Sequence, residues 1–145
     1  MFRYVAMPGP ELRKKTWFHF CWYHLPVILY AGVVITISSI PDLRTPAIRQ
    51  FAFDKLAHLM EYAIFAAITI RSFSNAPGLI PARRAFIVSV LFLALFAVFD
   101  ETYQHFIPGR FSSATDALAD IVGALLVLAF FEVRRRRLAR VRKKA

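Results

Sequence analysis

Residues 86–99 read FIVSVLFLALFAVF, a run in which a single serine is the only polar residue. A helix needs ~20 predominantly apolar residues to cross the hydrocarbon core of a bilayer, and the neighbouring residues extend this run to that length. A second run, LPVILYAGVVITISSI at 25–40, has the same character. The 145-residue chain is 58% hydrophobic, with a mean hydropathy of +0.50, whereas soluble domains are ~45–50% apolar. These features indicate an integral membrane protein.

Four segments of membrane-spanning length are predicted in the chain. They lie at about 17–40, 51–70, 85–106 and 115–131. Each connection between them contains proline, and two of the connections contain the turn-forming pair Pro-Gly. The expected fold class is all-α: a four-helix transmembrane bundle that forms a single domain at 17–133.

The distribution of basic residues predicts the orientation of this bundle. Fifteen of the 19 lysines and arginines lie in the N-terminal tail at 1–16, in the connection between the second and third segments, or in the C-terminal tail at 134–145. Lys/Arg-rich loops are retained in the cytoplasm, so both termini are expected to be cytoplasmic in a multi-pass protein of a bacterial-type inner (plasma) membrane. The basic tails are expected to attract anionic membrane lipids. Nucleic-acid binding is not expected, because no aromatic platform or known module accompanies the charges.

Six of the nine acidic residues lie within or beside apolar segments, where burying a charge costs from ~3 to more than ~10 kcal/mol, depending on the reference state. These residues are Asp54, Glu61, Asp100, Glu101, Asp116 and Asp120, and they are accompanied by His58, Gln104, His105 and Arg110. In the predicted orientation, all of them fall toward the extracytoplasmic half of the bundle. We therefore expect one polar pocket on that side, and the cost of placing charges there indicates a function for them.

Helical periodicity divides these residues into stripes, since side chains four or seven positions apart share one face of a helix. The stripes are Asp54, His58 and Glu61; Asp100 and Gln104, beside Glu101 and His105; and Asp116, Asp120 and Gly123. Gly123 would allow a neighbouring helix to approach closely. Arg110 is the nearest candidate cation for Asp100 and Glu101. Residues 113–116 resemble a capping box in which Asp replaces the usual Glu or Gln, which gives Asp116 an alternative, structural role.

Three of these segments resemble signatures of the VanZ-like family. Residues 54–62 fit D-K-x-x-H-x-x-x-Y, residues 100–110 fit D-E-x-x-Q…P-G-R, and residues 113–123 fit S-x-x-D…G. Order and spacing are kept over about residues 20–131, with one departure at Asp120, where many members carry asparagine. The resemblance implies a small multi-span bacterial membrane protein, in a family whose namesake is associated with low-level resistance to the lipoglycopeptide teicoplanin.

The first functional hypothesis is an intramembrane enzyme that acts at the outer leaflet on a lipid-linked or cell-envelope molecule. Burial would poise His58 or Glu101 as general base or acid, while Glu61 and Asp100 would orient the histidines. The candidate catalytic residues are His58, Glu61, Asp100, Glu101 and His105. The candidate ligand-binding residues are Asp54, Lys55, Tyr62, Gln104, Arg110, Ser113, Asp116 and Asp120. Among these, Lys55 and Arg110 would hold a phosphate or carboxylate.

Two other hypotheses remain open. The same residues could bind a lipid head group or an antibiotic without catalysis, or relay protons, as intramembrane Asp, Glu and His chains do. They could instead form a structural network that fixes helix packing. No cofactor is expected, because no H-E-x-x-H or other strong metal-ligand spacing occurs. A metal-dependent variant of the enzyme would use His58, Glu61, Asp100 and His105.

Overall fold

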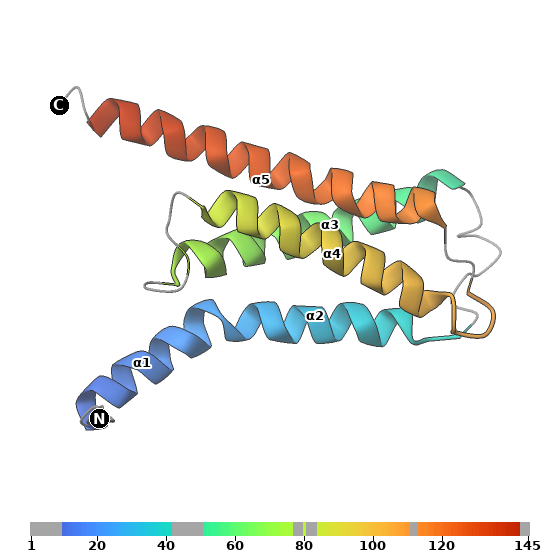
Figure 1. Cartoon of the computed structure of the whole chain (residues 1–145), viewed down its shortest axis with the longest axis horizontal. Helices are drawn as coiled ribbons and strands as arrows, with labels where there is room; N and C mark the ends of the chain where they lie inside the picture. The colour runs from blue at the N-terminus through green and yellow to red at the C-terminus, as the bar shows by residue number, and fades with distance from the viewer. Residues whose placement is uncertain (1–9, 42–50, 77–79, 81–83, 111–112, 143–145) are drawn as a thin grey trace, which may run out of the picture.

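The computed structural model describes residues 10–41, 51–76, 80, 84–110 and 113–142, and within these residues it is helical apart from turns. Its helices are α1 (Pro10–Tyr23), α2 (Leu25–Ser38), α3 (Phe51–Ser74), α4 (Ala85–Gln104) and α5 (Ala114–Arg142) (Figure 1). Four stretches are long and apolar enough to cross a membrane, namely Lys15–Ser38, Phe53–Ser74, Ala85–Gln104 and Ala114–Val141. The prediction of an all-α bundle with four membrane-spanning segments is confirmed.

The first of these segments is divided into α1 and α2 at His24, and Figure 1 shows the two helices at an angle. Pro26 lies two residues later, at the start of α2, and proline cannot donate the backbone hydrogen bond that would continue the helix from α1. Proline is a common cause of such kinks. The kink is attached to the bundle, because Nδ1 of His24 lies 2.8 Å from Oγ of Ser72 on α3.

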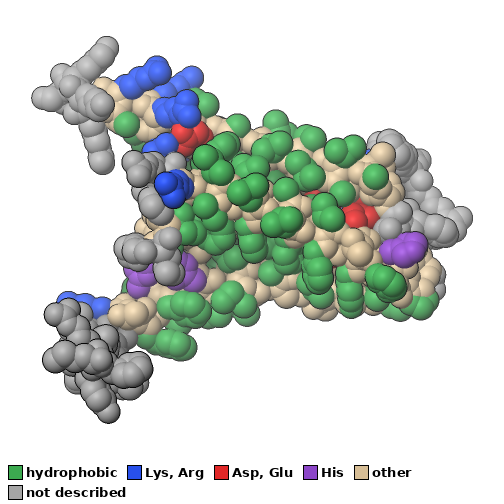
Figure 2. All heavy atoms as spheres, viewed as in Figure 1, with side chains coloured by type: hydrophobic (Ala, Val, Ile, Leu, Met, Phe, Trp, Pro, Cys, Tyr) green, Lys and Arg blue, Asp and Glu red, His purple; other side chains and the backbone are tan. Residues whose placement is uncertain are grey.

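The centre of the bundle is apolar and rich in aromatic rings. α3 contacts α2, α4 and α5, and Tyr62, Phe65 and Leu128 are fully buried between these helices. The ring of Phe65 packs edge-on against Phe96, with centroids 5.0 Å apart. The outward side is apolar as well: Leu95 is 71% exposed, and Figure 2 shows hydrophobic side chains across the middle of one face. A continuous apolar outer surface is typical of a protein that contacts lipid.

The two ends of the bundle differ in their chemistry. α1 begins and α5 ends at one end, which we call the basic end, and Lys and Arg side chains gather there on the face shown in Figure 2. At the basic end, α5 continues as a helix through residues 134–142, and Glu132 accepts hydrogen bonds from Arg135 and Arg136. α3 and α5 begin and α4 ends at the opposite end, which we call the acidic end.

α3 and α5 approach each other closely where Leu59 faces Gly123. A Cβ atom at Gly123 would overlap the backbone carbonyl group of Leu59. The predicted close approach at Gly123 is thus confirmed, and the partner helix is α3. Gly32 on α2 differs, because a Cβ atom there would have no neighbour within 4 Å.

Substitution of Gly123 by alanine should push α3 and α5 apart and lower the thermal stability of the protein in detergent, because overpacking costs ~1–3 kcal/mol. Gly32→Ala is the matched control: it adds the same methyl group where there is space and where alanine favours the helix. Circular dichroism measures the melting temperatures. Equal melting temperatures for the two variants would show that the contact does not limit stability.

Candidate functional site

Polar and charged side chains of α3, α4 and α5 gather at the acidic end. We call this group the polar cluster; it consists of Asp54, Lys55, His58, Glu61, Tyr62, Asp100, Glu101, Gln104, Asp116 and Asp120. Seven of its ten side chains are buried, and those of Asp100, Asp116 and Asp120 are at most 1% exposed. The predicted acidic stripes therefore face the inside of the bundle.

An ion pair between Lys55 and Asp116 joins α3 to α5 in this cluster. Nζ of Lys55 also lies 3.9 Å from Oδ2 of Asp54. The side chain of Asp116 is almost completely buried, whereas those of Lys55 and Asp54 are each 18% exposed. Lys55 therefore reaches from the edge of the bundle toward its interior.

The start of α5 is capped in a different way from the predicted capping box. In that motif, the Asp116 carboxylate would accept the backbone N–H of Ser113. Instead, this N–H donates to Oε2 of Glu101 on α4 at 2.8 Å, and Asp116 pairs with Lys55. Oγ of Ser113 accepts the backbone N–H of Thr115 at 3.1 Å, as an N-cap side chain does. Glu101 thus ties the last turn of α4 to the start of α5.

His58 on α3 and Asp120 on α5 form a buried hydrogen-bonded pair. Nδ1 of His58 lies 3.0 Å from Oδ1 of Asp120, whose side chain is fully buried. One nitrogen or oxygen atom from each of His58, Glu101 and Asp120 lies within 4.8 Å of the other two. We call these three residues the His58 group. Because a carboxylate holds one of its ring nitrogens, the imidazole has a fixed orientation.

Asp100 and Gln104 link α4 to the end of α2. Nε2 of Gln104 donates to Oδ2 of Asp100 and to Oγ of Ser38, at 3.2 Å in each case. Ser38 is buried, and it is not among the site residues predicted from the sequence. The available signal was weak, since Ser38 is one of several small polar residues at the end of an apolar run.

Glu61 and Tyr62 lie farther along α3 from the acidic end. The side chain of Tyr62 is fully buried, and its hydroxyl has no hydrogen-bond partner among the residues that the structure describes. The side chain of Glu61 is partly exposed and interacts electrostatically with His58, Asp100 and Asp120. These two residues extend the polar cluster toward the apolar centre of the bundle.

His105 does not join the cluster, although the predicted stripe placed it beside Glu101. α4 ends at Gln104, and His105 at the C-cap is exposed, with its ring against that of Phe106. His105 keeps helical backbone angles, φ = −59° and ψ = −27°, but it lies one residue beyond the end of α4, and its predicted catalytic role stays a prediction.

Arg110 is bound to the backbone at the end of α2. Its guanidinium donates hydrogen bonds to the carbonyl oxygens of Ile37 and Ile40, where a cation complements the C-terminal end of a helix. Gly109 precedes it with φ = 73°, a left-handed conformation that favours glycine. Arg110 interacts electrostatically with Asp100, so it contributes positive charge while anchoring the loop.

The polar cluster contains more carboxylates than cationic groups. Its six acidic residues share Lys55 and the protonatable His58, with Arg110 nearby. Buried oxygens of three acids, Oδ1 of Asp100, Oε1 of Glu101 and Oδ2 of Asp120, have no hydrogen-bond partner in the described part of the chain. Leaving a buried polar group unsatisfied costs ~1–3 kcal/mol, and more for a charged group. The arrangement is therefore suited to bind protons, a cation or the donor groups of a ligand.

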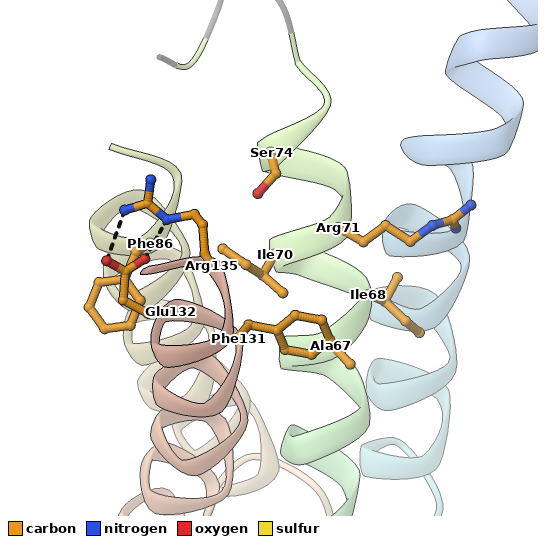
Figure 3. A pocket seen from close by; sticks show the side chains of 9 residues that line it. All are labelled: Ala67, Ile68, Ile70, Arg71, Ser74, Phe86, Phe131, Glu132 and Arg135. Atoms are coloured by element: carbon orange, nitrogen blue, oxygen red, sulfur yellow. Dashed lines mark hydrogen bonds and ion pairs between the residues drawn. The ribbon is translucent and has the colours of Figure 1, made fainter. Parts of the chain in front are cut away.

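A separate cavity of about 580 Å³ lies at the basic end, between α3, α4 and α5 (Figure 3). Phe131 and Ile70 line it, and Arg135, which is paired with Glu132, borders it. Arg71 points away, and its guanidinium carbon lies 5.3 Å from the ring of Trp22. Because no residue of the polar cluster lines this cavity, the expected pocket at the acidic end stays a prediction.

Comparison with known protein families identifies a match. The family model described as VanZ/LLP1 matches residues 9–135 of the chain. No curated protein and no solved structure shows a significant match. The matched region contains every residue of the polar cluster and the residues that hold it, Ser38, Arg110 and Ser113.

Breaking the ion pair between Lys55 and Asp116 should destabilise the bundle. Lys55→Met leaves the buried carboxylate of Asp116 without its ammonium, and removal of one partner from a buried pair costs ~3–5 kcal/mol. The double variant Lys55→Met/Asp116→Leu should recover part of this loss, because the buried carboxylate that paired with Lys55 is removed as well. Chemical denaturation in detergent measures both free energies of unfolding.

Glu132→Gln is the control for this pair, because it weakens an ion pair with the exposed Arg135 that is expected to contribute less than ~1 kcal/mol. If the double variant were as unstable as Lys55→Met, the loss would come from packing rather than from the unpaired carboxylate.

Proposed function

Because the chain belongs to the VanZ/LLP1 family and has four segments able to cross a membrane, we propose that it is an inner-membrane protein that binds and acts on a lipid-linked or cell-envelope molecule. The observation that carries the proposal is the convergence of buried carboxylates and an imidazole from three helices at one end of the bundle. Ionisable groups within a membrane are costly, and those that are retained mark binding sites, proton relays or transport paths.

The acidic end faces away from the cytoplasm in this proposal. The arginines and lysines of the basic end support this orientation, because basic segments are retained in the cytoplasm. The polar cluster would then meet molecules of the outer leaflet and the cell envelope. In the cell, the proposed physiological role of the protein is a contribution to teicoplanin resistance, which the name of the family suggests.

The polar cluster offers one group for recognition and one for chemistry. Lys55 is partly exposed at the edge of the cluster, and its ammonium can meet a phosphate or carboxylate as a point charge. Further inside, Asp120 orients the imidazole of His58, and a carboxylate oxygen of Glu101 lies within 4.8 Å of a ring nitrogen of His58 and of a carboxylate oxygen of Asp120. Positioned acids and bases accelerate a reaction by ~10²–10⁴-fold. The His58 group is therefore the proposed chemical centre of the site.

A proton-relay or non-catalytic binding module is the second candidate. The unpartnered buried oxygens of Asp100, Glu101 and Asp120 favour it, since carboxylates in such surroundings can hold protons without a substrate. A purely structural network has less support. Such a network stabilises a bundle best when all of its buried polar atoms are satisfied.

The proposal predicts that an envelope molecule accompanies the purified protein. Native mass spectrometry in mild detergent should detect a lipid-linked adduct on the wild type. His58→Ala and Glu101→Gln should lose this adduct or retain it in unprocessed form, while the variants still insert and remain monodisperse. His105→Ala is the matched control, because this histidine is exposed outside the polar cluster, and the variant should behave as the wild type.

The same four proteins, expressed in a bacterium susceptible to teicoplanin, test the proposed physiological role. Wild type and His105→Ala should raise the inhibitory concentration, whereas the two cluster variants should not. Wild-type protein that carries only bulk phospholipid and leaves susceptibility unchanged would argue against the proposal.

The proposed orientation predicts which exposed positions can be labelled from outside the cell. In a Cys21→Ser background, Pro108→Cys at the acidic end should react with a membrane-impermeant thiol reagent added to intact cells. Arg137→Cys at the basic end should react only after permeabilisation. The reverse labelling pattern would place the polar cluster on the cytoplasmic side.

A further inference from the structure

We propose that His58, Glu101 and Asp120 together bind one divalent transition-metal cation, such as Zn²⁺, Mn²⁺ or Fe²⁺. The three residues come from α3, α4 and α5, and all are at least nine-tenths buried. The inference adds a cofactor to the site of the proposed function. Its biological role rests on that function, but its binding test does not.

The geometry of the His58 group fits a metal centre. Protein nitrogen and oxygen ligands lie ~2.0–2.2 Å from Zn²⁺, so two ligands of a tetrahedral ion are ~3.3–3.6 Å apart. Nδ1 of His58 and Oδ1 of Asp120 are 3.0 Å apart, and one possible ligand atom from each of His58, Glu101 and Asp120 lies within 4.8 Å of the other two. Small side-chain movements would therefore bring all three atoms to coordination distance.

The unpartnered carboxylate oxygens are the second, independent observation. In Glu101, Oε2 accepts the backbone N–H of Ser113, while Oε1 is buried without a hydrogen-bond partner among the described residues. In Asp120, Oδ1 contacts His58, while Oδ2 is likewise buried and unpartnered within the described ranges. Each acid thus has one buried oxygen without a donor, and Ser113, which lies outside the ligand set, orients Glu101 through its other oxygen. Outer-shell hydrogen bonds orient metal ligands in the same way.

The neighbouring cations make their closest described contacts elsewhere, although Lys55 also interacts electrostatically with Glu101. Lys55 pairs with Asp116 and Asp54, and Arg110 donates to backbone carbonyls at the end of α2. A second group of possible ligands uses the same imidazole and consists of Asp54, His58 and Asp116. In this group, the ammonium of Lys55 already pairs with the carboxylate of Asp116. The structure therefore favours the His58 group as the position of the ion.

The donor atoms indicate the class of ion. Ca²⁺ and Mg²⁺ bind almost exclusively to oxygen, whereas an imidazole together with carboxylates suits Zn²⁺, Mn²⁺ or Fe²⁺. A metal ion at Nδ1 would displace the proton that lies between His58 and Asp120 in the metal-free state, and the neutral imidazole would then carry this proton on Nε2. Two carboxylates would neutralise the charge of a divalent ion.

The test is a metal titration of protein that has been purified in mild detergent and stripped with a chelator. Wild type should bind one equivalent of Zn²⁺ or Mn²⁺, measured by elemental analysis after gel filtration. Glu101→Gln and Asp120→Asn should each lose more affinity than the ~10–100-fold that outer-shell changes cost. Glu132→Gln, which removes an acid at the basic end, should bind as the wild type.

Spectroscopy of the wild type keeps the test decisive if a ligand variant fails to fold. Electron spin-echo measurements on Mn²⁺-loaded protein should show coupling to a histidine nitrogen, and His105→Ala should leave this signal unchanged. Absence of saturable binding, or equal binding by wild type and both carboxamide variants, would overturn the metal site. A metal-loaded protein that captures no envelope molecule would instead overturn the proposed function.

Discussion

The arrangement of the polar cluster depends on the close approach of α3 and α5 at Leu59 and Gly123. Asp120 and Asp116 lie three and seven residues before Gly123, so the face of α5 that touches α3 also presents both carboxylates. His58 and Lys55 lie one and four residues before Leu59, and they meet these carboxylates from the other side. A side chain at Gly123 would separate the helices and with them both charge pairs. The absence of a side chain at Gly123 thus determines the geometry of two interhelical contacts, His58 with Asp120 and Lys55 with Asp116.

The buried charges also explain how these helices recognise each other in a lipid environment. Lipid tails are as apolar as leucine, so apolar surface alone provides no strong force between helices in a membrane. Polar contacts make the packing of these helices specific, because each contact joins a different pair of helices. Lys55 pairs with Asp116, and Glu101 accepts the backbone N–H of Ser113. Gln104 extends the same network to Ser38 on α2. The cluster therefore fixes the relative positions of all four spans at one end, whatever ligand it binds.

The sequence predicted the parts of this structure that depend on local patterns. Apolar runs of sufficient length predicted the four spans, and Gly123 predicted a close approach without naming the partner helix. The kink at His24 was not anticipated, although Pro26 was its local signal. The partners of Arg110 and Ser113 could not be derived, because they lie on other parts of the chain: Arg110 donates to backbone carbonyls at the end of α2, and the backbone N–H of Ser113 donates to Glu101 on α4. The His58 group has no spacing to detect, since its members lie on three helices, and the cavity at the basic end is formed in the same non-local way.

The kinked first span has a consequence for how deeply the protein sits in its bilayer. Trp17 and Trp22 on α1 are exposed, and tryptophans prefer the interface between lipid and water, which anchors the helix at that level. From the kink, α2 extends ~20 Å to Ser38, which contacts the polar cluster. In a hydrocarbon layer that is ~30 Å thick, we therefore expect the cluster near the far boundary. Membrane thickness then governs the hydration of these acids. In a thinner bilayer they contact water, and in a thicker bilayer they lie within the hydrocarbon layer.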